Sequence, residues 1–202
     1  GDQNVGVGHQ ALCKSTTADN NTAVGACSLH ANTTGANNTA VGCGALLANT
    51  TASSNVAMGT DALNANTTGC RSVAIGADSL KANTTGVNNV ASGFQSMLLN
   101  TEGSRNSAYG YSSLGSNTTG NCNTAIGCGS LGGNTTADHN TAIGFDSLKA
   151  NTTGTLNTMV GSCSGFAMTT GQQNSGIGIN TFQANTTGSR NSTVGASSFS
   201  SN

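Results

Sequence analysis

The feature of this chain that most constrains its fold is a glycine that returns every 17 residues. The period holds from Gly8 to Gly195 without an insertion or a deletion. Such self-similarity is typical of repeat architectures, in which each unit contacts only its neighbours along one axis. Counted from Asn4, residues 4–190 form eleven full units, and 191–202 form a truncated twelfth. We expect one solenoid over the whole chain, as a fragment of a longer protein.

The unit reads approximately N-T-A-V-G-x-x-S-L-x-A-N-T-T-G-x-x, and its columns indicate strands. The fourth position is apolar except at Ser92, and the ninth is Leu, Met or Phe except at Gly165. Seventeen residues are too few for two helices with their turns, and β-branched residues favour strands. We predict an all-β fold, a parallel β-solenoid with 17-residue coils. Each coil should have two short strands and buried fourth and ninth side chains, with like residues stacked about 4.8 Å apart.

The core of such a coil is thin, and this bears on assembly. Two large buried side chains contribute about 1.5–3 kcal/mol each, whereas ordering the backbone costs roughly 1–2 kcal/mol per residue. One coil therefore cannot fold alone, and three chains wound together would add the missing burial. We expect a homotrimeric fibre, with the fifth-position glycines at tight turns or close contacts. These structural glycines are Gly25, Gly42, Gly59, Gly76, Gly93, Gly110, Gly127 and Gly144.

Composition argues against several function classes. Only 6% of the residues are charged and the net charge is −1, so no electrostatic footprint for nucleic acid is present. No apolar run approaches the roughly 18 residues that a membrane span needs. We expect no nucleic-acid partner, no membrane insertion and no cofactor.

The Asn-Thr-Thr stretch of each unit admits three roles. Stacked side chains could form hydrogen-bonded ladders between coils. The same letters form an Asn-x-Thr glycosylation acceptor. An outward threonine column could bind an ordered lattice such as ice or a polysaccharide. The candidate glycosylation residues are Asn32, Asn49, Asn66, Asn83, Asn117, Asn134, Asn151 and Asn185. The candidate lattice-binding column is Thr33, Thr50, Thr67, Thr84, Thr118, Thr135, Thr152 and Thr186.

Residues that could carry catalysis or hold a metal are scattered. The three histidines occupy different positions of the unit, and the seven cysteines share no column in neighbouring coils. Asp61 and Asp78 do share the seventh position of adjacent coils, which places the carboxylates about 5 Å apart as a paired-carboxylate active site, a cation site or a solvated surface pair. We predict that the chain is not an enzyme and has no metal site.

The variable positions of the unit should face outward. They are the sixth, seventh, tenth, sixteenth and seventeenth, and they carry most of the aromatic and basic residues. Such residues are the best candidates for contacts to a receptor or a cell-surface glycan. They are Phe94, Tyr111, Phe145, Phe166, Lys81, Lys149, Arg71, Arg105 and Arg190.

The stretch NTAVGACSLHANTTGANNTAVGCGALLANTTASSN at 21–55 resembles the 17-residue repeats of tail-fibre-domain proteins from bacteriophages, large algal viruses and bacterial surfaces. The stretch SVAIGADS at 72–79 is similar, more distantly, to the head repeats of trimeric autotransporter adhesins. The resemblance implies a trimeric fibre, extracellular or on a virion or cell surface, that mediates attachment. We therefore expect a structural shaft that displays a binding region away from the surface. The alternative is an ice- or polysaccharide-binding solenoid that uses the stacked Thr and Asn columns.

Overall fold

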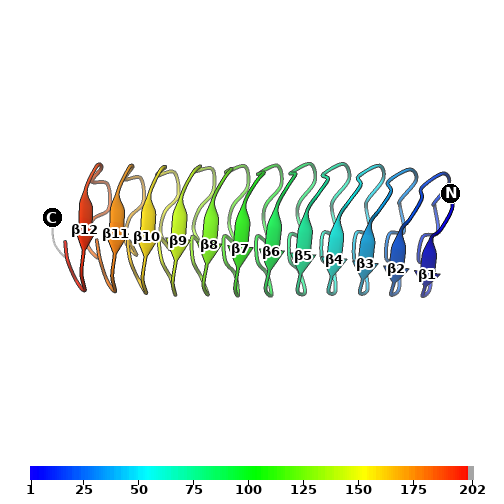
Figure 1. Ribbon diagram of the computed structural model, residues 1–202, viewed down its shortest axis with the longest axis horizontal. Helices are drawn as coiled ribbons and strands as arrows, with labels where there is room; N and C mark the ends of the chain where they lie inside the picture. Colours follow the sequence, from blue (N-terminus) through cyan, green and yellow to red (C-terminus); the bar gives the residue numbers. More distant parts are fainter. Residues whose placement is uncertain (200–202) are drawn as a thin grey trace.

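The computed structural model describes residues 1–199 and is a rod of stacked coils (Figure 1). Its strands form a single 12-stranded parallel sheet in which they follow one another in sequence order. The strands are β1 (Val5–Val7), β2 (Thr22–Val24), β3 (Thr39–Val41), β4 (Val56–Met58), β5 (Val73–Ile75), β6 (Val90–Ser92), β7 (Ser107–Tyr109), β8 (Thr124–Ile126), β9 (Thr141–Ile143), β10 (Thr158–Val160), β11 (Ser175–Ile177) and β12 (Ser192–Val194).

Neighbouring strands pair with an offset of one unit along the whole rod. Val73 of β5 lies opposite Val90 of β6, and Ala74 lies opposite Ala91. Like residues therefore stack on like, and the described residues contain no helix. The predicted all-β parallel solenoid with 17-residue coils is confirmed.

Each coil has one strand, so the prediction of a second strand is wrong. The segment around the ninth position has left-handed backbone, with φ of 57° at Asp78 and 51° at Leu80. Extended strands require negative φ, so these residues cannot continue a strand. The segment still bonds between coils, since the amide of Leu80 donates to the carbonyl oxygen of Ser96 at 3.0 Å. The coil-to-coil hydrogen bonds thus continue where the strand geometry ends.

The core consists of the third- and ninth-position side chains. Ala74 and Leu80 are fully buried, and their counterparts along the rod form one continuous apolar cluster. The ninth-position prediction is confirmed. The fourth position was predicted to be buried and is not, because the side chains of Val73 and Ile75 share one face of the strand while Ala74 takes the other. The outward face of the sheet therefore carries the larger aliphatic residues.

The fifth-position glycines allow successive coils to approach closely. Gly76 has a φ of +121°, and a Cβ on it would lie 2.7 Å from the carbonyl carbon and oxygen of Gly93. The eight glycines predicted to be structural all have φ between +121° and +140°. Both the backbone conformation and the lack of space require glycine here.

Candidate functional site

The candidate glycosylation asparagines lie inside the rod. Asn83 donates from Nδ2 to Oδ1 of Asn66 at 2.9 Å and to the carbonyl oxygen of Gly86 at 3.0 Å. The same ladder runs without a break from Asn151 down to Asn32. All eight candidates are buried. A glycan would have to attach to Nδ2, so the folded geometry favours the ladder role.

A second ladder uses the first-position asparagines. Asn21 accepts through Oδ1 from the backbone amide of Asn38 at 2.9 Å, and Asn38 donates from Nδ2 to the carbonyl oxygen of Ala52 at 2.9 Å. The pattern continues through most coils, with Ser72 taking one place in it. The two ladders satisfy the polar groups of an interior that has few apolar side chains.

The two threonine columns have different environments. In the thirteenth position, Thr84 is half-buried, and its hydroxyl donates to the carbonyl oxygen of Thr101 at 3.1 Å. The candidate lattice-binding threonines repeat this bond, except Thr186 in the last full coil. In the fourteenth position, Thr85 and its counterparts are exposed. The threonine column that is open to solvent is therefore the neighbour of the candidate column.

An apolar stripe follows the outward face of the sheet. We define it as the fourth-position residues of β1 to β12, at the end of each arrow in Figure 1, which are apolar except for Ser92 of β6. Ile75 is 42% exposed, although it is a large aliphatic residue. The other exposed members are Val7, Val24, Met58, Tyr109, Ile126, Ile177 and Val194. Exposed apolar side chains in one continuous line are a candidate interaction surface.

The predicted Asp61–Asp78 pair is bridged by a lysine. The Lys81 ammonium lies 3.0 Å from Oδ2 of Asp61 and 2.8 Å from Oδ1 of Asp78. The hydrogen bonds that Lys81 donates to Asp78 and, to a smaller extent, to Asp61 raise the pKa of Lys81 above its ordinary value. Lys81 occupies the place that a cation would take between the carboxylates, so the cluster is a surface ion pair.

The remaining chemistry-bearing residues stay apart. All seven cysteines are free thiols. Among residues 1–199, no three His, Cys, Asp or Glu side chains lie close enough together to hold a metal ion. The same residues form no helix with the length and apolar character of a membrane span.

A groove interrupts the otherwise regular side of the rod between the sixth and ninth coils (89–105 to 140–156). Its volume is about 570 Å³. The floor of the groove has no large side chains, because the seventh, tenth and eleventh positions of its two middle coils are occupied by small residues. These floor residues are Ser112, Gly115, Ser116, Gly129, Gly132 and Gly133.

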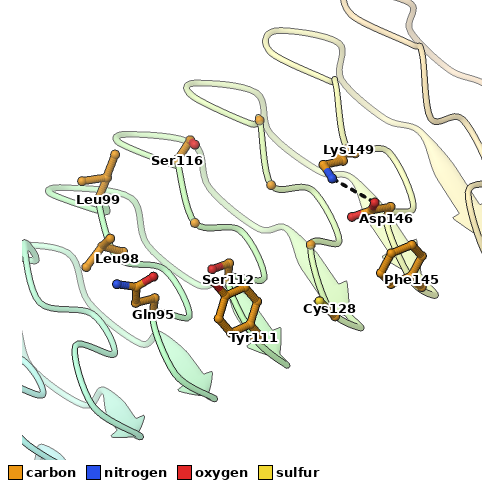
Figure 2. A pocket seen from close by; sticks show the side chains of 14 residues that line it. Gln95, Leu98, Leu99, Tyr111, Ser112, Ser116, Cys128, Phe145, Asp146 and Lys149 are labelled. Atoms are coloured by element: carbon orange, nitrogen blue, oxygen red, sulfur yellow. Dashed lines mark hydrogen bonds and ion pairs between the residues drawn. The ribbon is translucent and has the colours of Figure 1, made fainter.

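Larger side chains bound the groove on the other sides. Figure 2 shows Tyr111, Cys128 and Phe145 in a row beside the strand ends. Leu98 and Leu99 lie at one end, and an Asp146–Lys149 ion pair of 2.9 Å lies at the other. Two further rings extend the aromatic surface. Phe94 stacks on Tyr111 with centroids 5.8 Å apart, and the Lys149 ammonium lies 5.9 Å from the ring centroid of Phe166.

The four aromatic residues predicted to face outward at variable positions are exposed and lie near one another. The fold places Phe94, Tyr111, Phe145 and Phe166 along one side of neighbouring coils. Sequence reasoning missed the groove itself, whose signal is the glycine-rich segment 127–133. A scan against protein-family models and searches of curated proteins and of solved structures gave no match to this chain.

Proposed function

We propose that the chain is the repeat shaft of a fibre or adhesin on a virion, cell or other extracellular surface, and that it assembles as a homotrimer. The shaft mediates attachment by holding a binding region away from that surface. The observation that carries the proposal is the apolar stripe, which runs along an in-register sheet for the length of the rod. A partner that covers it must have the same axial repeat, and a second copy of this chain has it.

The geometry of the coil supports a structural role. Each coil adds a fixed rise of about 4.8 Å and bonds only to its neighbours, so length is set by the number of repeats. The side chains available for chemistry are dispersed, and a line of exposed aliphatic residues follows the sheet face. The resemblance to trimeric fibre repeats supports three chains over two, with each sheet turned toward a common axis.

Light scattering on the native chain tests this proposal. We expect a mass three times the 19.7 kDa of one chain and the hydrodynamic behaviour of an elongated particle. The mass of a single chain at micromolar concentration would overturn the trimer. A mass of two chains would keep the sheet-face contact and overturn the number of chains.

A second candidate function has an observation in its favour. The fourteenth-position threonines form an exposed column, with hydroxyl groups repeated at about the 4.8 Å strand spacing. Such an array could match an ordered lattice, either ice or a polysaccharide. Inhibition of ice growth by the chain, and its loss on replacing Thr68, Thr85 and Thr119 by Lys, would support this function. Unchanged ice growth in the presence of the native chain would remove its ice-binding form.

A further inference from the structure

The lysine in the groove between the sixth and ninth coils has one carboxylate partner, whereas the corresponding lysine elsewhere in the chain has two. Lys81 in the tenth position pairs with Asp78 of its own coil and with Asp61 of the preceding coil. Lys149 also occupies a tenth position, and it pairs with Asp146 of its own coil. The residue that corresponds to Asp61 is Gly129. One of the two carboxylates around the ammonium is therefore absent.

The ammonium of Lys149 remains available to a ligand. Its side chain is 48% exposed, whereas that of Asp146 is 11% exposed. Among the described residues, its single hydrogen bond joins it to Oδ2 of Asp146 at 2.9 Å. An ammonium has three donors, so donors are left over. Asp146 and Lys149 are the charged residues that line the groove, and Lys81 shows that this fold holds two carboxylates around one lysine.

The rest of the groove suits a ring with one apolar face and a polar rim. Tyr111 and Phe145 offer aromatic surface beside the bare glycine floor. Gln95, Ser112 and Ser116 bring an amide and two hydroxyl groups to the lining. A saccharide ring has this combination, because its C–H bonds form apolar faces while its hydroxyl groups project at the edge. The volume of about 570 Å³ lies within the usual range for small-molecule sites.

An extended peptide fits less well. Peptides that add to a sheet need an open row of backbone donors and acceptors. Here the backbone groups beside the groove already bond between coils, as in Ser112 to Phe94 at 3.0 Å and Gly133 to Lys149 at 2.8 Å. The groove therefore offers side chains and bare glycine in place of a strand edge.

We propose that this groove binds a carboxylated pyranose of an acidic saccharide, with the ring against Tyr111, Phe145 and the glycine floor. Its carboxylate pairs with the Lys149 ammonium in the place that Asp61 takes beside Lys81. The proposal rests on the attachment role proposed above and assigns the shaft itself a ligand. It requires no particular number of chains, so light scattering and saccharide binding fail independently.

Calorimetric titration of the full chain with tri-galacturonate tests the site. We expect a Kd of about 1 mM or lower, and binding at least tenfold weaker for the methyl-esterified trisaccharide, which has the same rings without the charge. No binding of the acid at about 10 mM would overturn the proposal. Equal binding of acid and ester would overturn the ion pair with Lys149. Tighter binding of a Glu-rich pentapeptide would assign the groove to a protein partner and overturn the saccharide.

Two matched variants separate the site from general effects on the fold. Gly129→Asp supplies the missing carboxylate, and we expect it to weaken tri-galacturonate binding at least tenfold. Gly44→Asp makes the same change at another seventh-position glycine, with φ of 68° against 67° for Gly129 and an aspartate in the next coil. It should bind as the native chain does. Equal affinity of Gly129→Asp and the native chain, with the melting temperature kept, would overturn the assignment.

Thiol labelling locates the ligand without substitution. Cys128 and Cys43 are both exposed in the sixth position, and of these two only Cys128 lines the groove. We expect tri-galacturonate to slow alkylation of Cys128 at least threefold and to leave Cys43 unchanged, measured by peptide mass spectrometry. Equal rates at Cys128 with and without a bound saccharide would place the ligand elsewhere and overturn the site.

Discussion

Asn151 and Met168 occupy the same position of successive coils, and the asparagine ladder ends between them. The Oδ1 atom of Asn151 is buried and has no hydrogen-bond partner among the described residues. Met168 fills space beside Gly165, where a Cβ would lie 3.2 Å from its sulfur and 3.0 Å from Cγ of Met159. The tenth coil thus has glycine in place of the core leucine, and methionine in place of both the third-position alanine and the ladder asparagine.

Restoring this coil to the common pattern should stabilise the rod. The triple variant Met159→Ala, Gly165→Leu and Met168→Asn returns the ladder donor and the core leucine together, and we expect a higher melting temperature by thermal circular dichroism. Met168→Asn alone should lower it, because the cavity costs about 2–5 kcal/mol and the new hydrogen bond recovers about 1–3. A triple variant that melts below Met168→Asn would show that the methionines do not compensate for Gly165.

Gly110 should not tolerate a side chain. Its φ is +126°, and a Cβ would lie 2.8 Å from the carbonyl oxygen of Gly127. Gly110→Ala should therefore lower the free energy of unfolding by about 3 kcal/mol or more, from backbone strain and overpacking together. Gly195→Ala is the matched control, since Gly195 has a similar φ of +124° and nothing within 4 Å. Equal losses in urea unfolding would assign the whole effect to backbone strain.

The ninth position was predictable from sequence, whereas the fourth was not. Burial was inferred from apolar character, and both columns are apolar. The alternation of a strand puts the third and fourth residues on opposite faces, and the narrow interior accepts the smaller one. Where Phe182 replaces leucine, the third position shrinks further to Gly176, whose Cβ would lie 2.9 Å from the Phe182 ring. The complementary volumes of the third- and ninth-position side chains indicate which two columns are buried, whereas apolar character alone does not.

The surface features were predictable in part. The shared column of Asp61 and Asp78 correctly indicated neighbouring carboxylates, because an in-register stack preserves columns. The bridging role of Lys81 was not predicted, because the tenth and seventh positions of the unit come close in space only where the segment between them bends. The groove forms where small residues such as Gly129 and Gly132 occupy neighbouring surface positions. A repeat consensus does not contain this information, because these positions vary from unit to unit.

Asn83 should not tolerate loss of its amide nitrogen. Asn83→Asp removes the donor to Asn66 and Gly86 and places a carboxylate beside two acceptor oxygens in a buried site. We expect a loss of about 3 kcal/mol or more in urea unfolding. Asn88→Asp is the control for the same chemical change at a half-buried position outside the ladder. A loss for Asn83→Asp that matches the control would mean that the ladder contributes little.

The ion pairs of Lys81 should stabilise the rod up to strongly alkaline pH. Hydrogen bonds to Asp78 and Asp61 raise its pKa above the ordinary 10.5. The folded state therefore keeps its proton longer, so the stabilisation is complete below about pH 10.5 and disappears as pH rises through the raised pKa. Lys81→Gln should melt below the native chain at pH 8, with a difference that shrinks above pH 10.5. The pair is exposed, so the effect should stay under about 1 kcal/mol. Lys14→Gln, at an exposed position, is the control.

Substitutions at Ile75 and at Leu80 should distinguish a loss of assembly from a loss of folding. Leu80 is fully buried, so Leu80→Asp places a carboxylate in the core without a partner and should abolish the cooperative melting transition. Ile75 lies on the outward face of β5, within the apolar stripe, so Ile75→Asp should leave the circular dichroism spectrum of a single rod intact. It should nevertheless reduce the native mass from three chains to one, because the carboxylate would be buried between sheets. Thr85→Asp makes an exposed change on another side and should keep the trimer. A folded Ile75→Asp variant with the native mass would show that the stripe is not the contact between chains.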